Sequence, residues 1–149
     1  MNIVTQRKDD SLGLKPNVSY DIFILGDLIE NYFYLNFQLN SFNDSHDPYD
    51  SYFFIDKEVT VWVKDGVIET IRCVEHCYWL GKNLIGMKYD SFLKEYKVAP
   101  ASSEKLYVYD GSINRGQNQV VYDFDKEGLL IWVWKNKIKT VLISTYEEE

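Results

Sequence analysis

The sequence has 149 residues, near the commonest size of one folded domain, so we expect a single domain over residues 1–149. Its formal net charge of −7 opposes binding to phosphate backbones and anionic membranes, which makes nucleic acid and lipid surfaces unsuitable as direct partners. No apolar stretch has the length of a signal peptide or a membrane span, and this predicts a cytoplasmic protein.

The first half of the chain is predicted to form an antiparallel meander. The dipeptide Asp65-Gly66 is typical of a two-residue hairpin turn, so the strands on either side of it are expected to pair. The apolar and β-branched runs predict four strands here, at Tyr32–Leu39, Tyr52–Ile55, Val59–Lys64 and Val67–Cys73.

The second half is predicted to begin with a short helix and continue as another meander. The helix covers Phe92–Tyr96, with Asp90 or Ser91 as its N-cap, and Pro100 prevents it from extending. The four strands that follow are expected at Leu106–Asp110, Val120–Phe124, Leu129–Trp134 and Ile138–Ser144.

Short motifs recur along the chain at nearly one spacing. Two of them recur after 69 residues: Asp56-Lys57-Glu58 as Asp125-Lys126-Glu127, and Tyr20-Asp21-x-Phe23 as Tyr89-Asp90-x-Phe92. Trp62-Val63 recurs after 70 residues as Trp132-Val133. We interpret these matches as a duplication with halves at about 12–73 and 84–143, the alternative being two unrelated hairpins. The predicted fold class is α+β, with two tandem helix-plus-antiparallel-meander repeats forming one sheet that has helices on one face.

Three tryptophans are predicted to share one face of this sheet. Side chains alternate along a strand, so the aliphatic residues of 59–64 and 129–134 should face the helices, while Trp62, Trp132 and Trp134 point the other way. Tryptophans on an open face would be anchors for a protein partner. The alternative is that an N-terminal segment or the curvature of the sheet covers them as a second small core.

The loop before the second predicted strand carries three carboxylates, Asp44, Asp47 and Asp50. It lacks the glycine and the terminal glutamate of an EF-hand loop, so we do not predict a calcium site. We expect these carboxylates to steer a basic protein partner, and the alternative is a solvated turn.

Candidate residues for chemistry are few. Cys73, His76 and Cys77 lie close together, but a second pair of zinc ligands is missing, so we predict free thiols at a strand end and no metal. His76 and Cys77 are adjacent, and adjacent residues of a strand point to opposite faces, which argues against a nucleophile and its base. The sequence contains no phosphate-binding loop, serine elbow or dinucleotide fingerprint. The prediction is a protein that is not an enzyme and uses no cofactor.

The predicted layout resembles that of the beta-lactamase inhibitor protein and its relatives, and Gly86-Met87-Lys88-Tyr89-x-x-Phe92 is similar to a helix entry seen in small bacterial proteins of that kind. Those relatives are typically exported and often disulfide-bonded, so an intracellular counterpart is expected here. In size, acidity and aromatic content the chain also resembles bacterial immunity proteins that neutralise basic toxins. The resemblance implies a protein-binding inhibitor that occludes the active site of a basic toxin or nuclease. The alternative is a structural or assembly module that forms a homo-oligomer, such as a homodimer, without catalysis.

Overall fold

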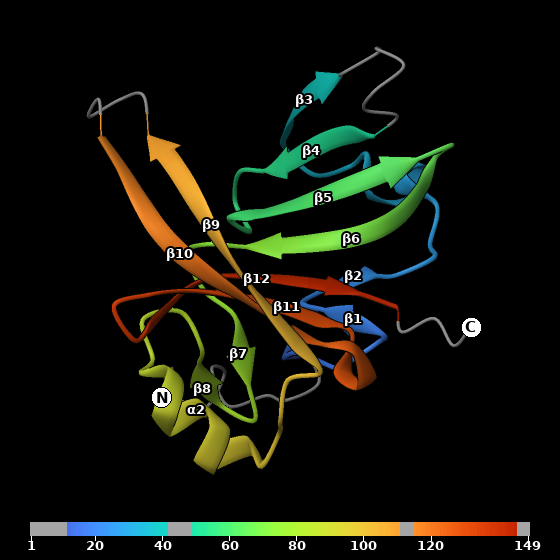
Figure 1. Ribbon diagram of the computed structural model, residues 1–149. Helices are drawn as coiled ribbons and strands as arrows, with labels where there is room; N and C mark the ends of the chain where they lie inside the picture. The colour runs from blue at the N-terminus through green and yellow to red at the C-terminus, as the bar shows by residue number, and fades with distance from the viewer. Residues whose placement is uncertain (1–11, 42–48, 111–114, 146–149) are drawn as a thin grey trace, which may run out of the picture.

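The computed structural model describes residues 12–41, 49–110 and 115–145, and its main element is an eight-stranded antiparallel sheet (Figure 1). The strands pair in the order β3-β4-β5-β6-β12-β11-β10-β9, so each half of the sequence contributes four consecutive strands, and β6 and β12 join them in the middle. Their bounds are β3 (Phe37–Ser41), β4 (Asp50–Phe54), β5 (Val59–Lys64), β6 (Val67–Cys73), β9 (Ser102–Asp110), β10 (Arg115–Phe124), β11 (Leu129–Trp134) and β12 (Lys137–Ser144).

Most of the predicted strands are present. The bounds of β5, β6 and β11 agree with the prediction, whereas β9 and β10 begin several residues earlier than predicted. The hairpin turn at Asp65-Gly66 is confirmed, because Lys64 pairs with Val67 and both turn residues have positive φ angles, 53° and 79°.

Short elements cover one face of the sheet, which we call the covered face. They precede each group of four strands and comprise the hairpin β1 (Ser19–Tyr20) and β2 (Phe23–Ile24), the 3-10 helix η2 (Ile29–Tyr32), the hairpin β7 (Tyr78–Trp79) and β8 (Lys82–Asn83), and α2 (Tyr89–Tyr96). A second 3-10 helix, η3 (Asp125–Glu127), lies between β10 and β11. None of the described helices is long and apolar enough to cross a membrane.

The prediction of two helix-plus-meander repeats with helices on one face is wrong, because the described residues form mainly β structure with one α-helix, α2. The motif at Tyr20–Phe23, matched above to the helix at Tyr89, is a β-hairpin whose turn residue Asp21 has a φ of 55°. Where the first half becomes helical, at Ile29–Tyr32, it forms only a 3-10 turn. Glu30 is the one strong helix former of that segment, whereas α2 has three in succession, Leu93, Lys94 and Glu95.

The N-cap prediction for the helix is also wrong. Helix α2 begins earlier than expected, so Asp90 and Ser91 lie in its first turn and the N-cap is Lys88, which makes no side-chain capping bond. Asp90 still carries a negative charge near the helix N-terminus, where it stabilises the helix dipole.

The core lies between the covered face and these short elements. Phe54 at the end of β4 packs on Phe23 of the β1–β2 hairpin, with ring centroids 4.7 Å apart. At the end of β10, Phe124 packs on Phe92 of α2, with centroids 5.6 Å apart. All four rings are fully buried, so each group of strands is attached to its covering elements by an aromatic contact.

A β-bulge interrupts the pairing at the same place in each half. In the first half Trp62 pairs with Thr70 but Val63 pairs with Ile68, so Glu69 of β6 is the extra residue. In the second half Lys139 of β12 is skipped in the same way, between the partners of Trp132 and Val133. A bulge reverses the alternation of side chains along its own strand, and here it decides which residues of β6 and β12 face away from the core.

Candidate functional site

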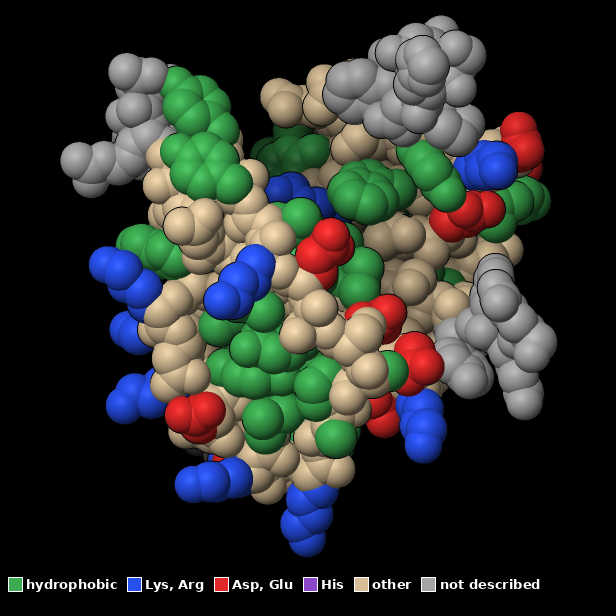
Figure 2. All heavy atoms as spheres, in the orientation of Figure 1, with side chains coloured by type: hydrophobic (Ala, Val, Ile, Leu, Met, Phe, Trp, Pro, Cys, Tyr) green, Lys and Arg blue, Asp and Glu red, His purple; other side chains and the backbone are tan. Residues whose placement is uncertain are grey.

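The face of the sheet opposite the covered face is hollow. One cavity on it is bordered by Trp62 of β5 and by Val108 of β9, although β6, β12, β11 and β10 separate these strands in the sheet. Two such strands can border one cavity only if the sheet curls toward this side, so we call it the concave face. Figure 2 shows a notch in the molecular outline between the tip of β9 and β10 and the strands β3 to β5, with hydrophobic side chains on both sides.

The first cavity has a volume of about 210 Å³. Two of the three predicted tryptophans, Trp62 and Trp132, come together in its wall, one from each half of the chain. Its complete lining is Trp62, Arg72, Val108, Gln119, Trp132, Thr140 and Leu142. The two indole rings and two aliphatic side chains make the walls apolar, and the polar groups are few and converge on one space, which is the usual composition of a binding site.

One cation lines this cavity without a partner in the described part of the chain. The half-buried Arg72 side chain forms no ion pair or hydrogen bond with any described residue, and none of its nitrogens is fully buried. The indole Nε1 of Trp132 also has no acceptor there, but it is buried and closed to water-sized molecules. Thr140 and Gln119 add side chains that can both donate and accept hydrogen bonds. The cavity therefore offers a ligand one unpaired positive charge.

A second cavity of about 510 Å³ adjoins the first and shares the Trp132 side chain. Its lining includes two carboxylates, those of Glu104 on β9 and Asp123 on β10. Burial raises the pKa of the Asp123 carboxyl above its ordinary value, and the neighbouring Asp125 carboxylate raises it further. The second cavity is thus acidic, whereas the first contains a cation and no carboxylate.

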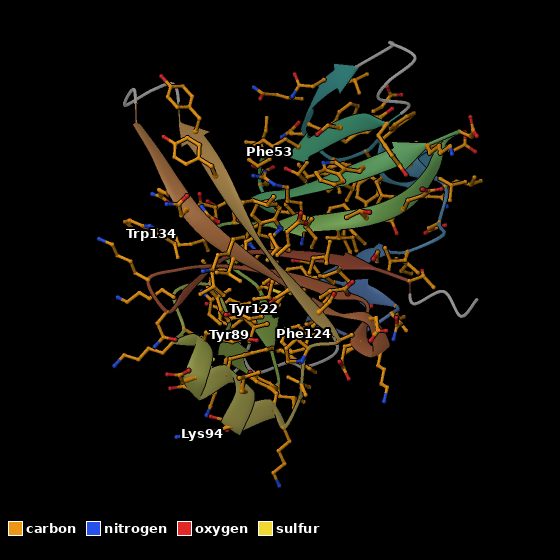
Figure 3. All side chains as sticks on the ribbon, in the orientation of Figure 1. Phe53, Tyr89, Lys94, Tyr122, Phe124 and Trp134 are labelled. Carbon is orange, nitrogen blue, oxygen red and sulfur yellow. The ribbon has the colours of Figure 1, made fainter. Side chains whose placement is uncertain are left out.

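Trp134, the third predicted tryptophan, does not line either cavity. It lies at the end of β11, where the ammonium groups of Lys135 and Lys139 are 4.7 and 5.7 Å from its ring centroid. Lys139 is the bulged residue of β12, so the bulge brings a cation to this ring. In Figure 3 Trp134 lies at the left of the view, well apart from Phe53 near the notch.

Of the three predicted loop carboxylates, the structure describes only that of Asp50. Asp44 and Asp47 lie outside the described residues. Asp50 is the first residue of β4 and pairs with Val63, which places it on the covered face of the sheet. Burial raises the pKa of the Tyr52 hydroxyl, and the Asp50 charge raises it further. Asp50 and Trp62 therefore lie on opposite faces.

The two cysteines are buried free thiols, as predicted. Burial, followed by a hydrogen bond with Cys73, raises the pKa of the Cys77 thiol well above its ordinary value, so Cys77 stays protonated and is a poor nucleophile. His76 is held by two hydrogen bonds of 2.7 Å, one between its Nδ1 and the hydroxyl of Tyr20 and one between its Nε2 and the carbonyl oxygen of Lys57. The carbonyl can only accept, so Nε2 carries the proton. Within 12–41, 49–110 and 115–145, no three potential metal ligands are grouped.

No protein-family model matches the chain, and neither a curated protein nor a solved structure matches it significantly. The resemblance to beta-lactamase inhibitor and immunity proteins therefore stays a prediction. The site has to be judged on its own residues.

Sequence reasoning missed most of the residues that border the tryptophans. Leu106 and Val108 could have been found, because they alternate along a predicted strand with exposed tyrosines. Arg72 could not, because the bulge that turns it toward Trp62 leaves no clear signal in the sequence.

Proposed function

We propose that the chain is a protein-binding inhibitor of the immunity-protein type, and that it covers the active site of a basic partner with its concave face. The observation that carries this proposal is the meeting of Trp62 and Trp132, from the two halves of the chain, in one cavity wall on the face that no other described element covers. Half-buried tryptophans in a hollow apolar surface are the usual energetic centre of a protein interface.

The charge of the chain supports a basic partner. The net charge of −7 accelerates encounter with a positively charged protein. Within the concave face, Glu104 and Asp123 line the larger cavity beside Trp132, so a lysine or arginine of the partner would find both carboxylates and an aromatic ring there. Inhibition would follow from occlusion, with no bond made or broken.

The test is a pull-down from an extract of the cells that make the protein, washed at low and then high salt. A Trp62→Ser/Trp132→Ser double variant is compared with a Tyr34→Ser/Leu80→Ser double variant, whose side chains are 76% and 67% exposed in the original chain and lie outside both cavities. The single variant Trp62→Ser serves if the first double variant does not fold.

We expect the original chain and the control to retain one stoichiometric basic protein that salt releases. Each anchoring tryptophan commonly contributes at least ~2 kcal/mol, or roughly thirtyfold in affinity, so the concave-face variant should lose that protein. Equal retention by the concave-face variant, or no retained protein at all, would contradict the proposal.

One observation favours a second function, that of an assembly module. β9 is a nine-residue strand at the edge of the sheet, and its Tyr107 and Tyr109 side chains are 66% and 57% exposed. An open edge of this length can pair with the same edge of a second copy and form a homodimer. Light scattering over a hundredfold range of concentration decides this, because a monomer throughout would eliminate the homodimer.

A further inference from the structure

We infer that the smaller cavity of the concave face binds a small organic carboxylate, with the carboxylate on Arg72 and an apolar or aromatic body between Trp62 and Trp132. This goes beyond the proposed function and does not depend on it, because Arg72 and the cavity are present whether or not the chain has a protein partner. The residues that carry the inference lie on strands of the central sheet, which is a rigid support for a site.

The lining of the cavity carries one charge, the positive charge of Arg72. Arg72 pairs in the sheet with Thr60 on one side and Leu142 on the other, so neither strand neighbour offers it a carboxylate. The cavity lining contains no aspartate or glutamate, and no described residue forms an ion pair with the guanidinium. A guanidinium in the wall of a largely apolar cavity can bind an anion that accepts two parallel hydrogen bonds.

The lining adds two neutral polar side chains to this cation. They are the Thr140 hydroxyl and the Gln119 amide, whose Nε2 donates to Gln117. The Nε1 of Trp132 is buried, so the indole ring serves the cavity as an apolar wall. A carboxylate can accept hydrogen bonds from both the Arg72 guanidinium and the Thr140 hydroxyl.

The volume and the single positive charge of the cavity restrict the ligand. The volume of about 210 Å³ is below the ~300–1,000 Å³ of sites for drug-sized ligands, so it suits a smaller molecule. Arg72 is the sole cation in the lining, and the chain as a whole is acidic, which disfavours a doubly charged phosphate. A single carboxylate on a ring or a branched apolar group matches one guanidinium and two indole walls.

The experiment titrates the full-length chain with phenylacetate and with its uncharged analogue phenylacetamide, followed by ligand-detected NMR. A second pair of probes, a short peptide ending in phenylalanine with a free or an amidated C-terminus, tells a free small molecule from a chain end as the source of the carboxylate. We expect saturable binding of the acids with a dissociation constant of about 1 mM or tighter, and at least tenfold weaker binding of the amides.

Three variants test the assignment of the site. Arg72→Met should weaken binding of the acid at least tenfold, Arg72→Lys should restore part of the loss because it keeps the charge, and Trp134→Phe should change nothing because Trp134 lies outside the cavity. Circular dichroism shows that each variant is folded. The inference is overturned if neither acid binds saturably, if acids and amides bind equally, or if Arg72→Met binds the acid as well as the original chain does.

This result is independent of the pull-down. Failure of the carboxylate titration leaves the protein partner untouched, and failure of the pull-down leaves the cavity and its donors as they are. The two proposals are therefore distinguished by separate measurements.

Discussion

The two faces of the sheet are built from the same strands but differ in how their side chains are satisfied. On the covered face of β6, Ile71 and Cys73 are completely buried against the hairpins and helices. Between them, Arg72 points to the concave face, where its guanidinium has no ion-pair partner among the described residues. The comparison shows that the covered face supplies the stability of the fold, while the concave face retains groups that a ligand or partner can satisfy.

The largest loss of stability is expected from a substitution on the covered face. Ile71→Ala removes a fully buried side chain and leaves a cavity in the core, so the free energy of unfolding should fall by about 2–5 kcal/mol. Leu106→Ala is the matched change on the concave face, where the side chain is half-buried, and it should cost much less. Urea denaturation measures both, and equal losses would break the comparison of the two faces.

The next largest loss of stability is expected at Gly128, where the chain has no room for a side chain. Gly128 has a φ of 70°, and a Cβ there would lie 2.0 Å from the Ser144 carbonyl oxygen and 2.5 Å from Asn17 Oδ1. Gly128→Ala should lower the free energy of unfolding by roughly 2–4 kcal/mol, through backbone strain and overpacking together. Gly66→Ala is the control, because its φ is 79° but nothing lies within 4 Å of the added atom. The account is contradicted if the two variants are equally stable.

The smallest effect concerns Asp123 on the concave face, and it depends on pH. The pKa of this carboxyl is raised in the folded chain, so ionisation is harder there than in the unfolded chain. The resulting cost is fully present above the folded pKa and disappears below the unfolded pKa of about 3.9. Asp123→Asn should therefore stabilise the chain at pH 7 and lose this advantage by about pH 3.

Denaturation at the two pH values checks this sign. Glu104→Gln, an exposed carboxylate in the same cavity lining, is the control and should gain less at pH 7. If the stabilisation by Asp123→Asn increased on acidification, the prediction would be contradicted, because the carboxylate would then stabilise the fold.

How much of the site the sequence could predict depends on the bulges. Regular pairing from the Asp65-Gly66 turn would place Arg72 opposite Val59, on the covered face, because Lys64 pairs with Val67. The bulge at Glu69 shifts the register, so Cys73 pairs with Val59 and Arg72 turns to the concave face. The bounds of β5, β6 and β11 follow from local patterns, but a one-residue shift in register does not.

The helical elements show a different limit. The similarity of Tyr20-Asp21-x-Phe23 to Tyr89-Asp90-x-Phe92 predicted a common element, yet the first is a hairpin and the second begins a helix. Four residues are too few to fix a conformation, because tertiary packing overrides weak propensities. The cavity between Trp62 and Val108 was equally out of reach, since it depends on twist accumulated over six strands.

The central claim, that the concave face is the binding face, is tested most directly by hydroxyl-radical footprinting of the chain alone and with the protein retained in the pull-down. The account predicts lower oxidation of Trp62, Trp132 and Leu106 in the complex, with Tyr34 and Leu80 oxidised as before. Protection of Tyr34 or Leu80 with unchanged oxidation of Trp62 and Trp132 would contradict it and place the interface elsewhere on the molecule.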